Sequence, residues 1–316
     1  MIVDFKPVLP FEPVSTDEWP VGTHFTSQIK WDGVRMLLYF DGSTTKLINR
    51  RTNDRTLQYP ELTNPQAFCS ADSVILDGEI IALSDGKPSF YEIMRRDSAR
   101  KSSTVTRVMG QVPITYMVFD ILYLNGDWLV HLSLKERQAT LASTIKPNHL
   151  VQLVTNHDEM EALFAIVKQH ELEGIVIKDL TSSYVINGKD KRWMKKKIFK
   201  DLYAVVGGVT YRDKIVNSLL LGLYDDQGQL WCIGYAGTGK LTVKDWQHVT
   251  EIVQSITTQE RPFVNEPERS KEAVWITPQL VVKVSFMEWT RNQTLRHPSI
   301  QSFIQMDSKA CNFSQN

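Results

Sequence analysis

The chain changes character near residue 200. In the first part, β-branched and aromatic runs bounded by Gly, Asp, Asn or Pro predict four strands, at residues 34–40, 74–81, 114–124 and 174–178. The Asp41-Gly42 pair after the first run predicts a hairpin turn into a further strand. These strands are separated by helical segments, so this part predicts an α+β domain with antiparallel sheets.

Two capping signals locate helices in the first part. Ser133 and Glu136 have the spacing of a capping box ahead of residues 134–145. Asp158 and Glu161 have the same spacing ahead of a segment whose apolar side chains fall on one helical face. We therefore expect Asp158 to cap that second helix.

From residue 200 onward, the sequence predicts mainly strands. Residues 225–229 (DDQGQ) join two alternating runs as a hairpin, one helix follows, and residues 280–286 predict a last strand. One helix among about five strands is typical of an OB-fold β-barrel. The 316 residues are about twice the length of a usual single domain. We expect two domains, at residues 1–199 and 200–316.

Composition excludes several classes of protein. Hydrophobic residues make up 42% and charged residues 23%, which excludes long disorder. No apolar run reaches the roughly 20 residues of a membrane helix, and no secretory signal is present, so the cytoplasm is expected. Three scattered cysteines predict reduced thiols rather than disulfides or a zinc site. The 36 basic residues balance the 36 acidic ones, so a nucleic-acid partner must be argued from local clusters.

Five short motifs suggest a chemistry. The first is Lys30-Trp31-Asp32-Gly33-Val34-Arg35, and four others follow it in order: LDGE at 76–79, VFD at 118–120, EGIVIK at 173–178 and WMKKK at 193–197. Nucleotidyl transfer from ATP needs an amine nucleophile, carboxylates for Mg²⁺ and cations that neutralise the α-phosphate. The motifs contain each of these groups.

In this order and spacing, the motifs resemble those of the covalent nucleotidyltransferases, which include ATP-dependent DNA ligases, RNA ligases and mRNA capping enzymes. The chain most resembles bacterial DNA ligases of the end-joining type, through INRRTND at 48–54, VFDILYLNG at 118–126, the run at 219–239 and WTRNQTLRHPS at 289–299. The resemblance implies a monomeric, two-domain ligase that seals nicks in duplex DNA with ATP and Mg²⁺, or with Mn²⁺ as a substitute.

The resemblance also implies roles for the reacting groups. Lys30 would be the nucleophile that forms lysyl-AMP, and Asp32 would help to place it. Glu173 would bind Mg²⁺, and Glu79 would contact the ribose or a water of the metal. The α-phosphate would be contacted by Lys195 and Lys197, whereas strand alternation would turn Lys196 away.

The remaining nucleotide and DNA contacts follow from the same resemblance. Phe119 would stack on adenine, and Arg35 would contact the ribose or the end of the nick. The nucleotide would also be contacted by Gln28, Ile29, Lys178 and Arg50. DNA phosphates would be bound by Arg50, Arg51 and Arg296. Further basic clusters that we expect on the DNA-facing side are Arg55, Arg95, Arg96, Arg100, Lys101, Lys189, Lys191, Arg192 and Arg291.

The chain departs from the family pattern at two positions. Gln28 stands where end-joining ligases commonly have Glu, and its amide can still meet the adenine amino group. The RxDK motif that orients the pyrophosphate of ATP is replaced by Ile304-Gln305-Met306-Asp307, with Lys309 two residues beyond. We therefore expect slow charging with ATP, while sealing of an already adenylated nick is less affected.

Two other functions remain open. An RNA ligase or capping-type guanylyltransferase would use the same lysine chemistry, and a nick-binding protein without catalysis would lack the charging motif. The sequence shows no additional DNA-clamping, polymerase or nuclease segment, so affinity would come from the two domains or from a DNA-end-binding partner.

Overall fold

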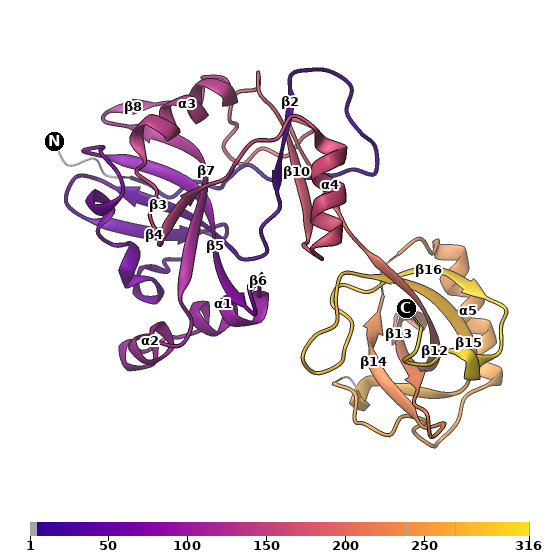
Figure 1. Ribbon diagram of the computed structural model, residues 1–316. Coiled ribbons are helices and arrows are strands. Elements are labelled where there is room, and N and C mark those ends of the chain that lie inside the picture. The colour runs from indigo at the N-terminus through magenta and orange to yellow at the C-terminus, as the bar shows by residue number, and fades with distance from the viewer. Residues whose placement is uncertain (1–4, 238, 269, 316) are drawn as a thin grey trace. The chain divides into compact units, whose positions relative to one another are not determined.

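The computed structural model describes residues 5–237, 239–268 and 270–315. Contacts divide the chain into two compact units, Met1–Ile198 and Phe199–Asn316. Figure 1 shows the helices and strands of both units. Each unit has its own hydrophobic core and is described separately below.

The larger sheet of the first unit has the strand order β4-β3-β5-β7-β8, with β6 paired to β5 and β9 paired to β7. All of its pairings are antiparallel except that of β7 with β9. The strands are β3 (Val34–Phe40), β4 (Thr45–Asn49), β5 (Val74–Ser84), β6 (Lys87–Pro88), β7 (Ile114–Leu124), β8 (Asp127–Trp128) and β9 (Val151–Leu153).

A smaller sheet in the same unit has the order β1-β11-β10-β2. Its strands are β1 (Val14–Ser15), β2 (Phe25–Ile29), β10 (Gly174–Asp179) and β11 (Trp193–Lys197). Leu37 and Ile75 of the larger sheet share one buried cluster with Trp193 of the smaller sheet. The two sheets therefore face each other across this cluster, and this interface positions the candidate site.

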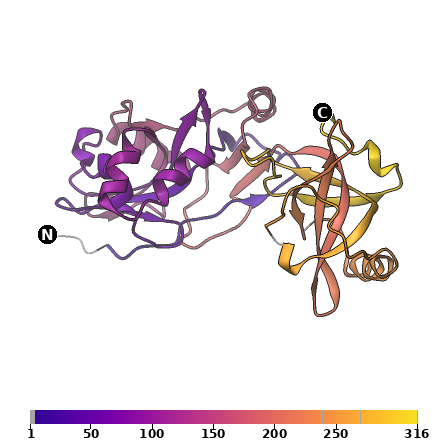
Figure 2. The same ribbon diagram turned by 90° about the horizontal axis from the view of Figure 1, so that it is seen from below.

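Helices cover the outer faces of both sheets. Ile93, Val108 and Leu141 of α1 (Phe90–Asp97), α2 (Ser102–Met109) and α3 (Leu134–Thr144) pack against the larger sheet. In Figure 2 the helices α1 and α2 lie in front of its strands. Leu163 and Val167 of α4 (Met160–Gln169) pack against the smaller sheet. Short 3-10 helices occur at Thr56–Gln58, Pro60–Leu62, Pro65–Ala67, Ser270–Glu272 and Ser308–Ala310.

The predicted strands of the first unit are present, with β7 matching its predicted bounds and β5 extending three residues further. The predicted hairpin is confirmed, since the Asp41 side chain accepts hydrogen bonds from the Ser43 and Thr44 amides at 2.8 and 2.7 Å. The capping box of Ser133 and Glu136 is also confirmed.

The predicted capping role of Asp158 is wrong. The helix begins one residue later, at Met160, with Glu159 as the N-cap and without a side-chain cap. The backbones of His157 and Ser27 exchange two hydrogen bonds of 2.8 Å, which keep the chain extended as far as residue 157. This anchoring moves the first helical residue out of the spacing that a capping box needs.

The second unit is the OB-fold predicted from the sequence. Its antiparallel sheet has the order β14-β13-β12-β15-β16, with strands β12 (Lys200–Arg212), β13 (Ile215–Tyr224), β14 (Leu230–Ala236), β15 (Val274–Phe286) and β16 (Ser299–Ile304). Figure 1 shows the helix α5 (Val243–Ser255) beside these strands. The helix contributes Val249 and Val253 to the apolar core of the unit. The last predicted strand is longer than expected, because β15 begins at Val274.

The three cysteines, Cys69, Cys232 and Cys311, are free and buried. In the described part of the chain, no helix combines the length and apolar character needed to cross a membrane.

Candidate active site

The inner face of the smaller sheet gathers the charged residues of three motifs. Gln28 and Lys30 are two residues apart along β2 and its end, so their side chains share a face. The Lys30 amide donates a 2.9 Å hydrogen bond to the Gly174 carbonyl, which extends the pairing of β2 with β10 as far as Lys30. This pairing brings Lys30 beside Glu173, 143 residues further along the chain.

Glu173 binds two lysines at once. Its Oε2 lies 2.5 Å from Lys30 Nζ, and its Oε1 lies 2.8 Å from Lys197 Nζ. Burial raises the pKa of this carboxyl, but the positive charges of Lys30 and Lys197 outweigh that effect and hold the pKa below its usual value. Glu173 is therefore ionised and keeps the two ammonium groups together.

The three lysines of β11 point to opposite faces of the sheet. Burial lowers the pKa of Lys195, and the nearby charges of Lys197 and Lys30 lower it further. Lys196 instead donates a hydrogen bond to the Asp17 carbonyl, and its Nζ lies 4.7 Å from the ring centroid of Trp19. Lys195 and Lys197 thus join Lys30, while Lys196 lies on the other face.

Two glycines permit the close approach of backbones at this site. A Cβ atom at Gly174 would lie 2.2 Å from the Lys196 carbonyl oxygen, and its φ of +145° disfavours other residues. A Cβ atom at Gly33 would lie 2.2 Å from the Ile80 carbonyl oxygen. Both motifs therefore require glycine next to their functional residues.

Arg35 is fixed by a bidentate ion pair. Its Nε and Nη2 donate to the two oxygens of Asp77 at 2.9 and 2.7 Å, and its Nη1 donates to the Phe11 carbonyl at 2.7 Å. Tyr184 donates a further hydrogen bond of 2.9 Å to Asp77. Three of the five N–H groups of Arg35 are thus engaged, which leaves two for the predicted contact with a nucleotide or a nick.

Phe119 lies among cations and one aromatic ring. Lys178 Nζ lies 4.2 Å from the centroid of its ring and 4.0 Å from that of Trp193. Lys178 is only 2% exposed, and no described residue accepts a hydrogen bond from its amine. Burial lowers the pKa of Lys178 to about 7, although the charges of Asp120 and Asp77 oppose this shift. Stacking of adenine on Phe119 remains a prediction.

The carboxylates predicted to hold a metal lie near one another. Burial raises the pKa of Glu79 to about 8. The positive charges of Lys30 and Arg35 offset this rise only in part. The negative charges of Glu173 and Asp32 raise the pKa further. Across residues 5–237, 239–268 and 270–315, no group of three or more His, Cys, Asp or Glu side chains forms a metal site. Mg²⁺ commonly uses one or two carboxylates together with substrate phosphates, and Glu173 and Glu79 fit such a partial set.

The two residues before Lys30 point in different directions. Ile29 packs with the apolar side chains that face α4, so its side chain lies away from the lysines. Gln28 is 2% exposed, and its Nε2 donates a 2.8 Å hydrogen bond to Asn156 Oδ1. A side-chain contact of Ile29 with a nucleotide therefore has no support in this geometry.

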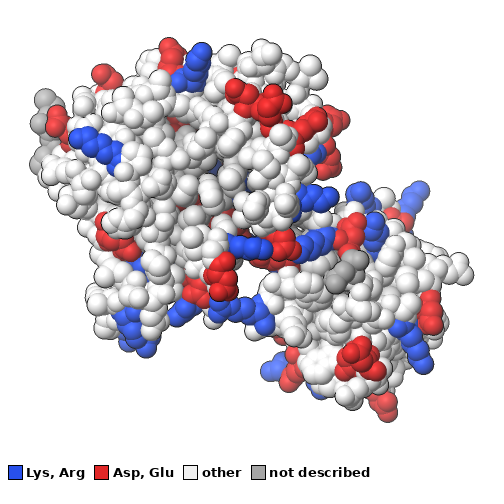
Figure 3. All heavy atoms as spheres, viewed as in Figure 1, with Lys and Arg blue, Asp and Glu red and all other residues white. Residues whose placement is uncertain are grey.

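The predicted DNA contacts differ in their surroundings. Arg50 and Arg51 are exposed in the turn after β4. Arg296 is half-buried and donates a 2.7 Å hydrogen bond to Glu288. On the face shown in Figure 3, basic and acidic side chains are interspersed on both units.

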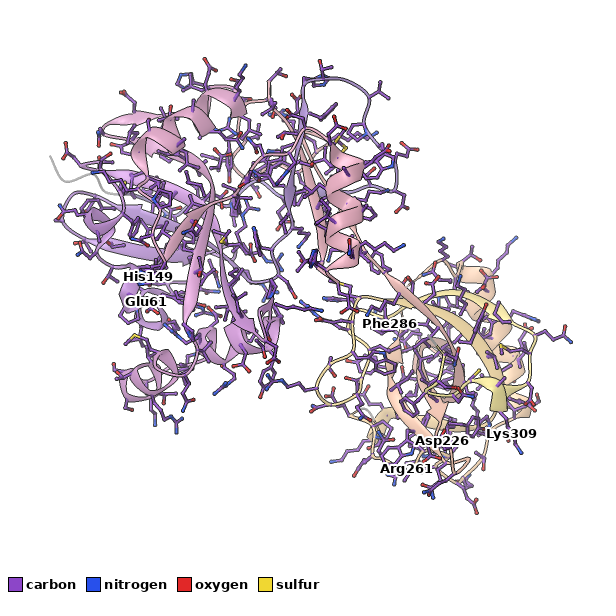
Figure 4. The ribbon with its side chains drawn as sticks, viewed as in Figure 1. Glu61, His149, Asp226, Arg261, Phe286 and Lys309 are labelled. Carbon is purple, nitrogen blue, oxygen red and sulfur yellow. The ribbon has the colours of Figure 1, made fainter. Side chains whose placement is uncertain are left out.

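One expected DNA contact is wrong. Arg96 is buried and donates to the carbonyls of Gln58 and Val112 and to Glu61, which is labelled in Figure 4. Its position in α1, rather than on a surface loop, directs the guanidinium into the protein. Arg96 is therefore a structural residue and cannot contact phosphates.

Two family models match this chain. Residues 17–197 match the ATP dependent DNA ligase domain, and residues 212–307 match the ATP dependent DNA ligase C terminal region. The chain belongs to the ATP-dependent DNA ligases. Both units of this ligase are covered, including the lysine and carboxylate cluster around Glu173.

Named relatives agree with this assignment. The ligase is 29% identical over 277 residues to the multifunctional non-homologous end joining DNA repair protein LigD of Mycobacterium tuberculosis, covering 85% of this chain and 35% of that protein. It is 30% identical over 279 residues to the DNA ligase of Archaeoglobus fulgidus, covering 83% of this chain and 48% of that protein. The chain thus spans about a third to a half of the length of these relatives.

A solved structure extends the comparison to the fold. The crystal structure of the ligase domain from M. tuberculosis LigD superimposes with a TM-score of 0.51 at 28% identity, covering 96% of this chain and 97% of that one. A Lig E DNA ligase structure superimposes with a TM-score of 0.60 at 17% identity and supports the fold alone.

The segment in place of the RxDK motif contributes to packing in this ligase. Ile304 and Met306 pack against the apolar core of the second unit. Asp307 Oδ1 accepts a 3.0 Å hydrogen bond from the Lys309 amide, and Lys309 is labelled in Figure 4. Asp307 therefore caps a 3-10 helix.

Several residues around the site were not predicted from the sequence. Asp77 and Tyr184 fix Arg35, and Asp120 forms a buried pair with Arg137 at 2.8 Å. Asp77 and Asp120 belong to the LDGE and VFD motifs at residues 76–79 and 118–120, so the sequence could have indicated that they lie near the site. Tyr184 has no such signal, because its role depends on contacts with residues far away in the sequence.

Proposed function

We propose that this ligase joins 5′-phosphate and 3′-hydroxyl ends at nicks in duplex DNA, with ATP and a lysyl-AMP intermediate on Lys30. The observation that carries the proposal is the contact of Glu173 with both Lys30 and Lys197, with Lys195 beside them. This arrangement supplies one nucleophilic amine and two cations for phosphate charge.

In the first step, Lys30 releases a proton to the solvent and its Nζ forms a bond to the α-phosphorus of ATP, while the bond to the pyrophosphate breaks and pyrophosphate leaves with the bonding electrons. Glu173 orients the amine, and Lys195 and Lys197 neutralise charge that develops on the phosphate. In the second step, a 5′-phosphate oxygen of the nick attacks the phosphorus of lysyl-AMP, and the protonated amine leaves.

In the third step, the 3′-hydroxyl attacks the adenylated 5′-phosphate, and AMP leaves as the new phosphodiester bond forms. This step needs mainly alignment of the two ends and neutralisation of charge. In this proposal, phosphates of the DNA backbone are bound by Arg50 and Arg51 of the first unit and by Arg296 of the second unit.

Glu173 and Glu79 would hold Mg²⁺, or Mn²⁺ in its place, with Asp32 close by. The metal would neutralise phosphate charge when bound. Glu79 has the raised pKa described above, so binding of a cation at this carboxyl would favour release of its proton.

The two units would have different roles in the reaction. Residues 1–199 carry out the adenylation chemistry, and residues 200–316 contact the nicked duplex, which is a common role of OB-folds. We propose that the ligase acts as a monomer in the cytoplasm, alone or with a DNA-end-binding partner.

The test is sealing of an end-labelled nicked duplex with a 5′-phosphate, in ATP and Mg²⁺. We compare the native protein with Lys30→Ala and with Lys196→Ala, a control that removes a lysine of the opposite face. Joining by the native protein and the control, but not by Lys30→Ala, is the expected result.

Two other results would replace the proposal. Preferential joining of a nicked RNA strand, or labelling by GTP rather than ATP, would indicate an RNA ligase or a capping-type enzyme. Binding of the nick without joining by the native protein, even when the nick is already adenylated, would indicate a nick-binding protein.

A further inference from the structure

Arg50 and Arg51 are two neighbouring arginines in the turn after β4, and both are exposed. Among the described residues, none forms an ion pair or a hydrogen bond with the guanidinium group of either. Elsewhere in the same unit, the guanidinium groups of Arg35, Arg96 and Arg137 are each paired with a carboxylate. The turn therefore presents two adjacent positive charges that an anionic ligand such as a DNA phosphate can bind.

The turn that carries the two arginines is closed by Asn49, the last residue of β4. Asn49 Oδ1 accepts hydrogen bonds from the Arg51 and Asn53 amides at 2.9 and 3.0 Å. The Asn49 carbonyl accepts a hydrogen bond from the Thr52 amide at 2.9 Å, and the Asn49 amide donates to the Asn53 carbonyl at 3.0 Å. The backbone of the turn is thus bound to a single residue.

Thr52 in this turn has an unfavourable backbone conformation. Its φ of +60° lies in the left-handed region, which a β-branched side chain rarely adopts. Such a conformation persists only where the surrounding contacts impose it, and it is common at functional sites. The contacts here are the hydrogen bond of the Thr52 amide to Asn49 and that of Thr52 Oγ1 to the Arg51 carbonyl at 2.7 Å.

The chain on both sides of the turn is attached to the larger sheet. β4 pairs with β3 along its whole length. Ile48 and Asp54 form an antiparallel bridge, and the Arg55 amide donates to the Leu47 carbonyl at 2.7 Å. The base of the turn is therefore fixed by strand pairing, whereas the shape of the turn itself depends on Asn49.

We infer that Asn49 is a positioning residue for nick recognition, which fixes the turn so that Arg50 and Arg51 bind phosphates of the DNA backbone. The inference rests on the proposed function, in which these two arginines contact DNA. A turn that is already ordered in the free protein does not have to be ordered when DNA binds, so less of the attraction for phosphates is offset. Loss of Asn49 should therefore weaken DNA binding and leave the adenylation of Lys30 unchanged.

The experiment measures binding of a fluorescently labelled nicked duplex by anisotropy, and formation of lysyl-AMP from labelled ATP. Asn49→Ala removes the side-chain acceptor, whereas Asn49→Ser keeps a hydroxyl oxygen that can accept from the same amides. The control is Asn148→Ala, the same substitution at another half-buried asparagine. Asn148 Oδ1 also accepts from two backbone amides, those of Leu150 and Val151 at 2.8 and 2.9 Å.

We expect Asn49→Ala to weaken binding of the nicked duplex by about tenfold, because the turn and two arginine side chains must then be ordered on binding. The rate of lysyl-AMP formation should not change. Asn49→Ser should keep most of the affinity for DNA, and the control Asn148→Ala should keep all of it.

A combination of substitutions tests whether Asn49 acts through the two arginines. Arg50→Ala with Arg51→Ala should weaken binding and reduce the slope of log affinity against log salt concentration by about two, for two lost phosphate contacts. Addition of Asn49→Ala to this protein should then have no further effect, because the groups that it positions are absent.

Four results would contradict one or both proposals. A full effect of Asn49→Ala in the protein without the two arginines would overturn the inference, and so would slower lysyl-AMP formation in Asn49→Ala, which indicates a merely structural role. If the native protein seals nicks and Asn49→Ala binds them equally well, the inference alone is wrong. If binding depends on Asn49 but the native protein seals nothing, the proposed function alone is wrong.

Discussion

The two units bury different kinds of side chain. In the first unit, Arg137 and Asp120 form an ion pair whose side chains are both 0% exposed, and Asp77 is fully buried beneath Arg35. In the second unit, among the described residues 199–237, 239–268 and 270–315, the buried polar side chains are Thr210 and Ser218, and no charged side chain is buried. The core of that unit is otherwise apolar.

The buried charges of the first unit fix the positions of site residues, whereas the apolar core of the second unit contributes stability. Burial of an ion pair contributes little net stability, because desolvation offsets the attraction between the charges. In the first unit, the buried pairs lie beside residues of the candidate site, since Asp77 fixes Arg35 and both Asp77 and Asp120 act on Lys178. The apolar core of the second unit gives stability without constraining charged groups. Substitutions should therefore affect the two units by different mechanisms.

The largest expected effect comes from breaking a buried pair. Asp120→Ala leaves the Arg137 charge buried and uncompensated, and we expect unfolding of the first unit to become easier by about 3–5 kcal/mol. Leu221→Ala in the second unit removes apolar packing and should cost about 2–5 kcal/mol. Scanning calorimetry would follow the transition of each unit.

A double substitution sharpens this comparison. Asp120→Leu with Arg137→Met removes both charges, and we expect it to recover most of the stability lost in Asp120→Ala. No apolar replacement of a single partner should do so. A double variant as unstable as Asp120→Ala would contradict the view that the pair contributes position rather than stability.

The second prediction tests the two faces of β11. We expect Lys195→Ala and Lys197→Ala each to slow nick sealing by about a hundredfold, because each removes a cation from the reacting phosphate. Lys196→Ala removes the same charge from the other face and should change the rate by less than about twofold. Single-turnover sealing measures all three, and equal losses at the three positions would mean that only the net charge matters.

The sequence predicted backbone elements better than buried charges. The strand at β7 was predicted residue for residue, because eleven mostly β-branched or aromatic residues mark it. The helices α1 and α2 were not predicted, since each spans eight residues and carries polar side chains that give a weak pattern. A local sequence pattern predicts an element correctly where the residues of that element alone determine which of its side chains are buried.

The candidate site was predictable where motifs supply the residues. Lys30, Glu173 and Lys197 were expected to cooperate, and the structure places them in contact. The burial of Arg96 and the amide contact of Asn156 with Gln28 were not predictable, because each depends on a partner brought close by tertiary structure. A basic or amide side chain does not reveal such a partner from its own neighbours in sequence.

The third prediction concerns the second unit, where Ile304 and Met306 contribute to packing in place of the charges of an RxDK motif. We expect formation of lysyl-AMP at moderate ATP to be about tenfold slower than sealing of a nick that is already adenylated. Rapid quench with labelled ATP, against sealing of a pre-adenylated duplex, gives both rates. Charging as fast as in a relative with the intact motif would contradict this prediction.

The smallest expected effect is a pH dependence found only in the first unit. The pKa of Lys178 is lowered to about 7 in the folded protein, from its ordinary value of 10.5. The unfolded chain therefore binds more protons between these two values, and stability rises with pH. The pKa of Glu79 is raised to about 8 from 4.5, so the folded protein binds more protons in that range and stability falls as pH rises.

Between pH 7 and 8 the two slopes oppose each other, and the native first unit should change little. In Lys178→Met only the Glu79 effect remains, and the free energy of unfolding should fall by on the order of 1 kcal/mol from pH 7 to pH 8. In Glu79→Gln only the Lys178 effect remains, and the free energy of unfolding should rise by a similar amount. Chemical denaturation at both pH values measures the free energy of unfolding, with the second unit as an internal reference. Because no charged side chain is buried among its described residues, that unit should show neither slope, and a slope there would break the contrast between the two cores.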